Sequence, residues 1–240
     1  MPGHTEKMKG LPRKDIARVA AEDIPEGYCV NLGIGLPTMI ADYIPAGREV
    51  LLQSEQGLLG LGPAPEPGQE DDDVVGAGKS HLTLLKGASV FSHSDSFLMI
   101  RGGHIDIACL GAFQVAENGD LANWSTGSLT ETPGVGGAMD LAAGAASVWV
   151  LMEHCQKDGA PRLLGRCTYP LTGHKCVTRI YTNLALIDVT LQGFVVQRIA
   201  DDIDFTTLQK LTGAKLSLSP SCKPYRPQLI LNADALSVRP

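Results

Sequence analysis

Hydrophobic and polar positions along the chain form blocks that predict strands and helices in turn. Short apolar runs between turn residues predict buried strands, and apolar positions that recur every three or four residues predict helices. The predicted strands cover residues 28–32, 49–53, 105–110, 148–152, 177–181, 184–189 and 194–199. The predicted helices cover residues 14–23, 95–100 (with Ser94 as its cap), 138–146 and 205–211 (with Asp204 as its cap), and another is expected to begin near Pro37.

Strands and helices alternate over the first two-thirds of the chain. This order favours an α/β fold with an open, largely parallel sheet and helices on both faces, and the last third is expected to add hairpins. An Asn118-Gly119 step predicts one more hairpin. The glycine- and proline-rich stretch after Glu55 is expected to be a loop, and the chain from Ser219 a tail that wraps the surface or is partly disordered. No linker or repeat divides the chain, so we expect one domain over residues 1–240.

Composition narrows the class of protein. Apolar residues make up 44% and charged residues 19%, which is enough for a packed core. The net charge of −6 argues against a nucleic-acid-coating protein, whose footprint is basic, but still permits a local site for an anion. The most apolar window, residues 134–155, contains Asp140 and Glu153 and is no membrane span. The six cysteines form no C-x-x-C pair and the histidines show no metal spacing, so we expect a cytoplasmic protein with reduced thiols and no metal.

Three junctions at helix starts or glycine loops are candidate ligand sites, because open α/β sheets bind ligands beyond the carboxyl ends of their strands. Glu55 is either a general base or nucleophile among glycines, or a loop acid that caps nearby amides. Gly136-Gly137 either offers amides to a phosphate or an oxyanion, or permits close helix packing. Gly33-Ile34-Gly35 lacks the third glycine of a dinucleotide fingerprint, and a plain tight turn is its alternative.

Two cations adjoin glycines. Lys79 either meets an anionic ligand or is solvated, and Arg101 either meets such a ligand or forms an ion pair. The aromatic residues Phe113, Trp124 and Trp149 are expected in the core rather than in a stacking platform. The residues by themselves therefore predict a ligand-binding α/β domain with a candidate reactive carboxylate.

Five motifs in order resemble the 3-oxoacid coenzyme A transferases. Residues 53–63, which contain Ser54-Glu55-Gln56-Gly57, resemble the Ser-Glu-Asn-Gly active-site segment of that family. Residues 30–37, 99–106, 119–124 and 136–141 resemble four further family motifs. The likeness covers about residues 11–216, which leaves residues 217–240 as a tail, and it matches only the B (β) half of the enzyme. The A half of such enzymes supplies a separate glycine-rich loop.

The resemblance implies a ping-pong transfer of CoA. Glu55 attacks the thioester carbonyl of an acyl-CoA, and the CoA thiolate then returns to the glutamyl carbonyl, leaving a glutamyl-CoA thioester. Gly137 aligns with an oxyanion-hole donor, Lys79 aligns with a lysine near bound CoA, and Gly33 and Gly35 are assigned to the CoA site. Water must be excluded, because either intermediate would hydrolyse. CoA is then a substrate, and no cofactor is expected.

The resemblance also implies partners and substrates. The expected partner is the CoA-transferase α (A) chain, in a heterotetramer of two A and two B subunits, and the substrates are succinyl-CoA and a 3-oxoacid. Residues 123–127 and 166–173 look more like the 3-oxoadipate branch of the family than the acetoacetate branch. A dianionic acceptor should need an additional cation near the acyl pocket. The sequence departs from the family at Gln56, where the family usually has asparagine.

Three hypotheses follow. The first is the catalytic β subunit of a 3-oxoacid CoA-transferase acting on 3-oxoadipate or, alternatively, on acetoacetate. The second is a non-catalytic acyl-CoA-binding subunit, supported by Gln56, which would tolerate loss of Glu55. The third is an acyl-CoA hydrolase in which water resolves the glutamyl intermediate. Release of free CoA without an acceptor acid would distinguish the third from the first.

Overall fold

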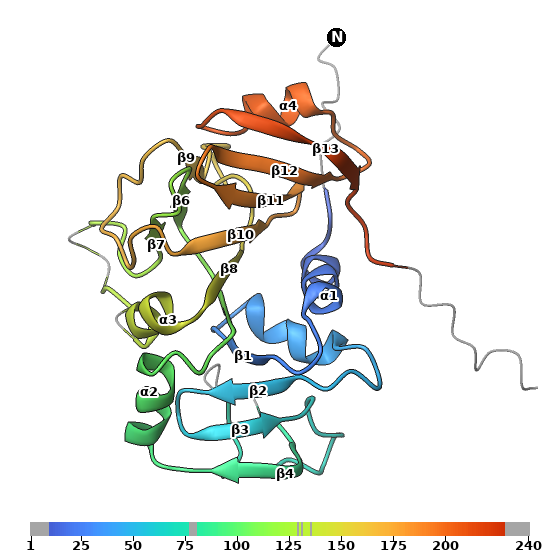
Figure 1. The fold of residues 1–240 in the computed structure, drawn as a ribbon, viewed down its shortest axis with the longest axis vertical. Coiled ribbons are helices and arrows are strands. Elements are labelled where there is room, and N and C mark those ends of the chain that lie inside the picture. Colours follow the sequence, from blue (N-terminus) through green and yellow to red (C-terminus); the bar gives the residue numbers. More distant parts are fainter. Residues whose placement is uncertain (1–9, 77–80, 129, 131, 135, 229–240) are drawn as a thin grey trace, which may run out of the picture.

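A computed structural model of the chain describes residues 10–76, 81–128, 130, 132–134 and 136–228. Ten strands form the main sheet: β1 (Cys29–Leu32), β2 (Leu51–Ser54), β3 (Leu58–Leu61), β4 (Leu84–Val90), β5 (Ile107–Leu110), β8 (Ser147–Leu151), β10 (Val177–Tyr181), β11 (Ala185–Thr190), β12 (Gly193–Ile199) and β13 (Leu216–Pro224). Their spatial order is β13-β12-β11-β10-β8-β5-β1-β2-β3-β4 (Figure 1). A small second sheet contains β6 (Gln114–Ala116), β7 (Leu121–Ala122) and β9 (Leu163–Leu164).

The centre of the main sheet is parallel. Strands β2, β1, β5, β8 and β10 run in one direction, and antiparallel strands extend the sheet on both sides through β3 and β4 and through β11 and β12. The last strand, β13, pairs in parallel with β12. The open, largely parallel α/β sheet expected from the sequence is confirmed.

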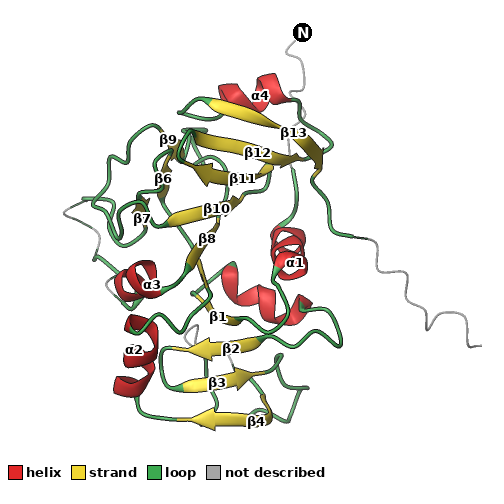
Figure 2. Cartoon of the chain, in the orientation of Figure 1, coloured by secondary structure: helices red, strands yellow, loops and turns green. Residues whose placement is uncertain are grey.

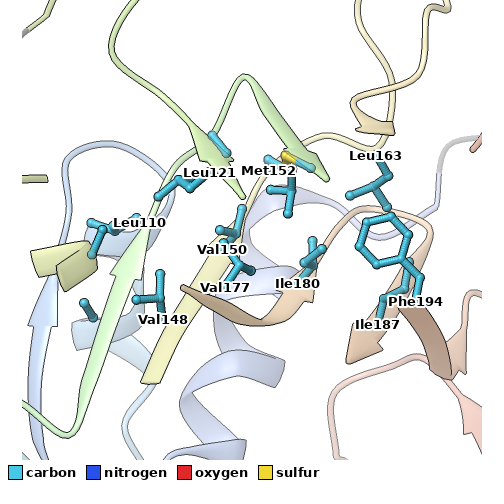
Figure 3. Packing of buried hydrophobic residues seen from close by; sticks show 14 of the residues in the cluster. Leu110, Leu121, Val148, Val150, Met152, Leu163, Val177, Ile180, Ile187 and Phe194 are labelled. Carbon is cyan, nitrogen blue, oxygen red and sulfur yellow. The ribbon is translucent and has the colours of Figure 1, made fainter. Parts of the chain in front are cut away.

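Strands β5, β8 and β10 each contribute to two hydrophobic cores. In β8, Val148 and Val150 point to one face, and Trp149 and Leu151 point to the other. Figure 3 shows the first core, in which Val148 and Val150 pack among side chains of neighbouring strands. Because successive strand residues face opposite sides, a strand buried on both faces reads as one continuous apolar run.

Helices cover both faces, as predicted. The core on one face includes residues of α2 (His93–Arg101) and α3 (Ala138–Gly144). The core on the other face includes residues of α1 (Arg13–Asp23) and the 3-10 helix η1 (Pro37–Tyr43). Figure 2 shows α1 on one side of the central strands and α2 and α3 on the other. Among the described residues, no helix has the length and apolar character needed to cross a membrane.

The helix starts follow local capping chemistry. The backbone N–H of Thr207 donates to the Asp204 carboxylate at 2.7 Å, which confirms Asp204 as the cap of α4 (Phe205–Lys210). The expected cap of α2 is wrong by two residues. Ser92, not Ser94, accepts the backbone N–H of Asp95 at 3.1 Å, because only Ser92 stands three residues before a donor in the first turn.

Helix α1 is held by the C-terminal third of the chain. The Asp23 carboxylate accepts hydrogen bonds from the Tyr181 hydroxyl (3.2 Å) and from Nη2 of Arg198 (2.9 Å). The fully buried ring of Tyr225 belongs to the same core as Ile16. The first described helix and the last strands therefore form one packing unit.

Two expectations about irregular segments are wrong. The predicted loop after Glu55 contains β3, which pairs with β4, and a glycine there permits close strand contact: a Cβ on Gly60 would lie 3.1 Å from Cα of Ala88. In the predicted surface tail from Ser219, residues 219–224 instead lie in β13 and lead to Tyr225, whose backbone N–H donates to the Ile199 carbonyl at 2.8 Å, whereas residues 229–240 lie outside the described residues. In both segments backbone pairing, rather than an apolar repeat, determines the structure.

Candidate active site

A cleft of about 1560 Å³ runs along the carboxyl ends of β1, β2, β5 and β8. Strand β1 lies between β2 and β5, where the strand order reverses, which is the usual ligand site of an open α/β sheet. Gly33, Gly35, Glu55 and Gly137 all line this cleft. The structure thus brings four of the five predicted site residues together, and Lys79 lies outside the described residues.

Glu55 is half-buried at the tip of the hairpin between β2 and β3. The turn is closed by the backbone N–H of Gly57, which donates to the Ser54 carbonyl at 3.0 Å. Gly57 has φ +113°, and a Cβ there would overlap the carbonyl oxygen of Phe91. Only glycine fits both constraints, so this residue permits the turn that carries Glu55.

Three buried polar side chains lie beneath Glu55. The Asn31 amide donates to Oε1 of Gln53 at 2.6 Å, and the Gln53 amide donates to Oγ of Ser96 at 2.6 Å. The Ser96 hydroxyl then donates to the Ser54 carbonyl at 3.1 Å, directly before the nucleophile candidate. The network joins β1, β2 and α2 under the hairpin turn.

The Asn31 amide also reaches Glu55. Its Nδ2 atom lies 3.4 Å from Oε2 of Glu55, so one face of the carboxylate meets a donor that Gln53 holds in place. Oδ1 of Asn31 is buried without a hydrogen-bond partner. The side chain's hydrogen bonds are therefore those that its NH2 group donates to Gln53 and Glu55. The sequence analysis missed this network. Its signal was two polar residues, Asn31 and Gln53, at paired positions of two buried strands.

Gly137 lies next to the carboxylate. A Cβ on Gly137 would stand 3.9 Å from Cγ of Glu55 and 3.1 Å from Cζ of Phe97. The residue is the N-cap of α3, and its carbonyl accepts the backbone N–H of Leu141 at 3.0 Å. Glycine therefore permits close packing against Phe97, and the oxyanion role of its amide stays a prediction.

The two glycines after β1 differ in their surroundings. Gly33 donates its N–H to the Cys109 carbonyl at 2.8 Å, and a Cβ there would approach the same oxygen to 3.0 Å. Gly35 has φ +96° and no heavy atom within 4 Å of a Cβ position, so it faces open space in the cleft. Gly33 thus permits close strand approach, and Gly35 leaves room for a ligand.

The structure also shows the surroundings of the other residues singled out in the sequence. The Arg101 guanidinium pairs with the Asp140 carboxylate at 2.7 Å, which confirms the ion-pair alternative. The Gln56 side chain is exposed and accepts a hydrogen bond from the Ser54 hydroxyl at 2.8 Å. Trp149 is buried as expected, but the expected core position of Phe113 is wrong: it lines the cleft and is 38% exposed, because it follows β5 where the sheet ends.

The described residues hold no cluster of three or more histidine, cysteine or acidic side chains suited to a metal ion. The prediction that the chain needs no metal or cofactor stays a prediction. The chemistry that the cleft supports is therefore that of Glu55, a carboxylate with one amide donor on it and a glycine amide close by.

Comparisons with known proteins identify relatives over most of the chain. The coenzyme A transferase family model matches residues 13–200. The B subunit of the 3-oxoadipate CoA-transferase of Pseudomonas putida is 58% identical over 208 residues, which cover 87% of this chain and 97% of that protein. The B subunit of the probable succinyl-CoA:3-ketoacid coenzyme A transferase of Bacillus subtilis is 45% identical over 210 residues, which cover 87% and 96%.

Solved structures share the fold at low sequence identity. Glutaconate coenzyme A-transferase from Acidaminococcus fermentans matches with a TM-score of 0.68 at 16% identity, covering 92% of this chain and 91% of that chain. The decarboxylase AibA/AibB matches with a TM-score of 0.67 at 19% identity, covering 91% and 90%. Because the second is named a decarboxylase, the fold by itself does not specify the reaction.

Proposed function

The chain belongs to the coenzyme A transferase family, and from that premise we propose that it is the β subunit of an enzyme that transfers CoA from succinyl-CoA to a 3-oxoacid. The proposed acceptor is 3-oxoadipate, because the relative with 58% identity carries that name, whereas the relative named for 3-ketoacids is 45% identical. The observation that carries the proposal is the half-buried Glu55 carboxylate, which lies in the cleft beside Gly137 and Asn31.

The proposed reaction uses Glu55 as a nucleophile. A carboxylate oxygen of Glu55 bonds to the acyl carbonyl carbon, the C–S bond breaks, and the CoA thiolate leaves with the electron pair. The thiolate then bonds to the glutamyl carbonyl carbon, the anhydride C–O bond breaks, and the first acid departs as a carboxylate. The acceptor acid reverses both steps, so the thioester bond energy is conserved throughout.

Residues around Glu55 have separate tasks in this proposal. Asn31 holds one carboxylate oxygen through its amide, so the other oxygen is free to attack. The backbone N–H of Gly137 would donate to the oxyanion that forms at the acyl or glutamyl carbonyl. Gly35 leaves room in the cleft for the CoA chain. Gly33 and Lys79 are assigned to the CoA site from the sequence.

The partner in this proposal is the α (A) chain of a CoA-transferase. Relatives named as B subunits support it, and the wide cleft of this chain needs a covering surface to exclude water from the anhydride. We propose a heterotetramer of two A and two B subunits, in which the α chain supplies the second oxyanion donor. Six free cysteines in the described structure support a reducing compartment such as the cytoplasm.

The test is covalent trapping on the complex with the α chain. Succinyl-CoA followed by borohydride should reduce a glutamyl thioester to an alcohol, so intact mass and peptide mapping should locate the loss of one oxygen and gain of two hydrogens at Glu55. Glu55→Gln should lose this label and all transfer while keeping the fold. Glu153→Gln, which changes another carboxylate lining the cleft, serves as the matched control and should keep the label.

Other outcomes would contradict the proposal in distinct ways. An unlabelled wild-type chain with CoA demonstrably bound would indicate a non-catalytic binding subunit. A labelled chain that releases free CoA rapidly without any acceptor acid would indicate a hydrolase. Faster transfer to acetoacetate than to 3-oxoadipate would retain the mechanism and replace the acceptor.

A further inference from the structure

Arg162 lines the same cleft as Glu55 and has a fixed backbone. Its N–H donates to the His154 carbonyl at 3.2 Å, and its own carbonyl accepts the N–H of Val115 at 3.0 Å. The residue lies directly before β9, where the chain returns to the small sheet. Its side chain is therefore presented to the cleft from an anchored segment.

The Arg162 guanidinium lacks a counterion within the described part of the chain. Its Nε is buried without a hydrogen-bond partner, and its Nη1 has one long contact, 3.5 Å, to the Ala112 carbonyl. By contrast, Arg179 and Arg198 form ion pairs with the carboxylates of Asp188 and Asp23. A guanidinium stays charged, and this one lines the cleft without a carboxylate beside it in the described part of the chain, so the site is suited to an anion.

The other cations of the cleft are more solvated. Arg13 and Lys157 also line it, but both are exposed, whereas Arg162 is half-buried. Water and salt screen an exposed charge far more than a partly buried one. Of these three cations in the described cleft, Arg162 is thus the one whose charge is least screened by water and salt.

The spacing of the strand ends that lead to Arg162's contact and to Glu55 suits a short dicarboxylic acid. Arg162 contacts Ala112 beyond the end of β5, and β5 is separated from β2, which leads to Glu55, by β1 alone. The carboxyl ends of β5 and β2 are therefore two strand spacings of about 4.8 Å, or roughly 10 Å, apart. An extended acid of four to six carbons, with bonds of about 1.5 Å, spans roughly 4–6 Å between its end carbons, and one polar contact at each end covers the rest.

We propose that Arg162 binds the distal carboxylate of a dicarboxylic acyl group while the thioester carbon of that group lies at Glu55. This inference rests on the proposed function and assigns its acyl specificity to one residue of this chain: Arg162 favours acyl groups that end in a carboxylate over those that end in a methyl group. The fork of N–H donors in a guanidinium matches the two oxygens of a carboxylate, and Nη1 has only its long contact to the Ala112 carbonyl. Succinyl-CoA and 3-oxoadipate both carry such a second carboxylate.

The test compares two acyl groups of equal length in the complex with the α chain. Succinyl-CoA ends in a carboxylate and butyryl-CoA ends in a methyl group, and the rate of glutamyl thioester formation is measured for each. Arg162→Gln should lower kcat/KM for succinyl-CoA by roughly 10- to 100-fold, the range of a charge-assisted hydrogen bond, and should change the value for butyryl-CoA by less than about 3-fold. Arg162→Lys should retain part of the preference, because it keeps the charge and loses the fork.

Arg166→Gln is the matched control, since Arg166 is exposed and does not line the cleft. It should leave both rates unchanged. An equal loss with both acyl groups in Arg162→Gln would overturn the inference and assign Arg162 to the phosphates of CoA. Unchanged rates with both would overturn it as well, and would indicate that a carboxylate of the partner chain neutralises the guanidinium. Failure of the wild-type complex to form any thioester would instead overturn the proposed function.

Discussion

Replacing Ser96 by alanine tests whether the buried network supports the Glu55 turn. The Ser96 hydroxyl accepts from Gln53 at 2.6 Å and donates to the Ser54 carbonyl at 3.1 Å, and the side chain is fully buried. In the variant the Ser54 carbonyl keeps the N–H of Gly57 at 3.0 Å as a donor. The Gln53 amide keeps a single acceptor, the Ser54 carbonyl at 3.1 Å.

The magnitude follows from this difference. One buried N–H of Gln53 loses its partner, which costs about 1–3 kcal/mol, whereas the Ser54 carbonyl remains satisfied and adds little. We therefore expect a loss of about 2 kcal/mol in the free energy of unfolding. For a chain of this length, that corresponds to a decrease in Tm of about 4–8 °C.

Ser94→Ala is the matched control, because Ser94 lies on the same helix and is exposed. Urea and thermal unfolding of both variants measure stability, and the rate of thioester formation on Glu55 measures the effect on the turn. Ser96→Ala should be less stable than Ser94→Ala and should form the thioester more slowly, because Asn31 and Gln53 are held less firmly. Equal stability and equal rates in the two variants would refute a supporting role for the network.

Three further substitutions have defined outcomes. Gly57→Ala should abolish transfer and lower the unfolding midpoint, because φ +113° strains alanine and its Cβ would overlap the Phe91 carbonyl oxygen; activity and thermal unfolding measure this. Gly144→Ala should lower Tm without removing Glu55 labelling, because its Cβ would overlap the Ile100 carbonyl oxygen where α3 meets α2. Burial lowers the pKa of His154 from 6.5 to about 4, so only the unfolded chain binds this proton between those pH values; urea unfolding should show about 3 kcal/mol lost as pH falls through this range, and His154→Gln should lack that loss.

The central sheet was predictable because its strands are buried on both faces. In residues 148–151 each side chain enters one of two cores, so the run is uniformly apolar and contrasts with its polar surroundings. Strand β4 lacks that signal. It is the outer strand of the sheet, most of its side chains are exposed, and Lys86 and Gly87 interrupt its apolar residues. An edge strand without a buried face has no alternation to detect.

The candidate site was predictable where its residues form short motifs at predicted strand ends or helix starts. Glu55 and Gly57 stand within one short segment, and the turn geometry that links them follows from their spacing. Ser96 and Arg162 come from distant segments, and nothing in their immediate neighbours marks them as part of the cleft or its support. Their importance depends on burial and on missing or completed hydrogen bonds, which are properties of the folded chain.

The attachment of α1 to the C-terminal strands has a consequence for synthesis on the ribosome. The carboxylate of Asp23 finds its partners, Tyr181 and Arg198, only after more than 150 further residues have been translated. At a synthesis rate of about 5–20 residues per second, the apolar face around Ile16 stays exposed for on the order of 10–30 s before the strands that enclose it are made. Helix α1 is thus synthesised before the other described elements and enclosed after most of them, and until then its apolar face is a surface to which a chaperone would bind.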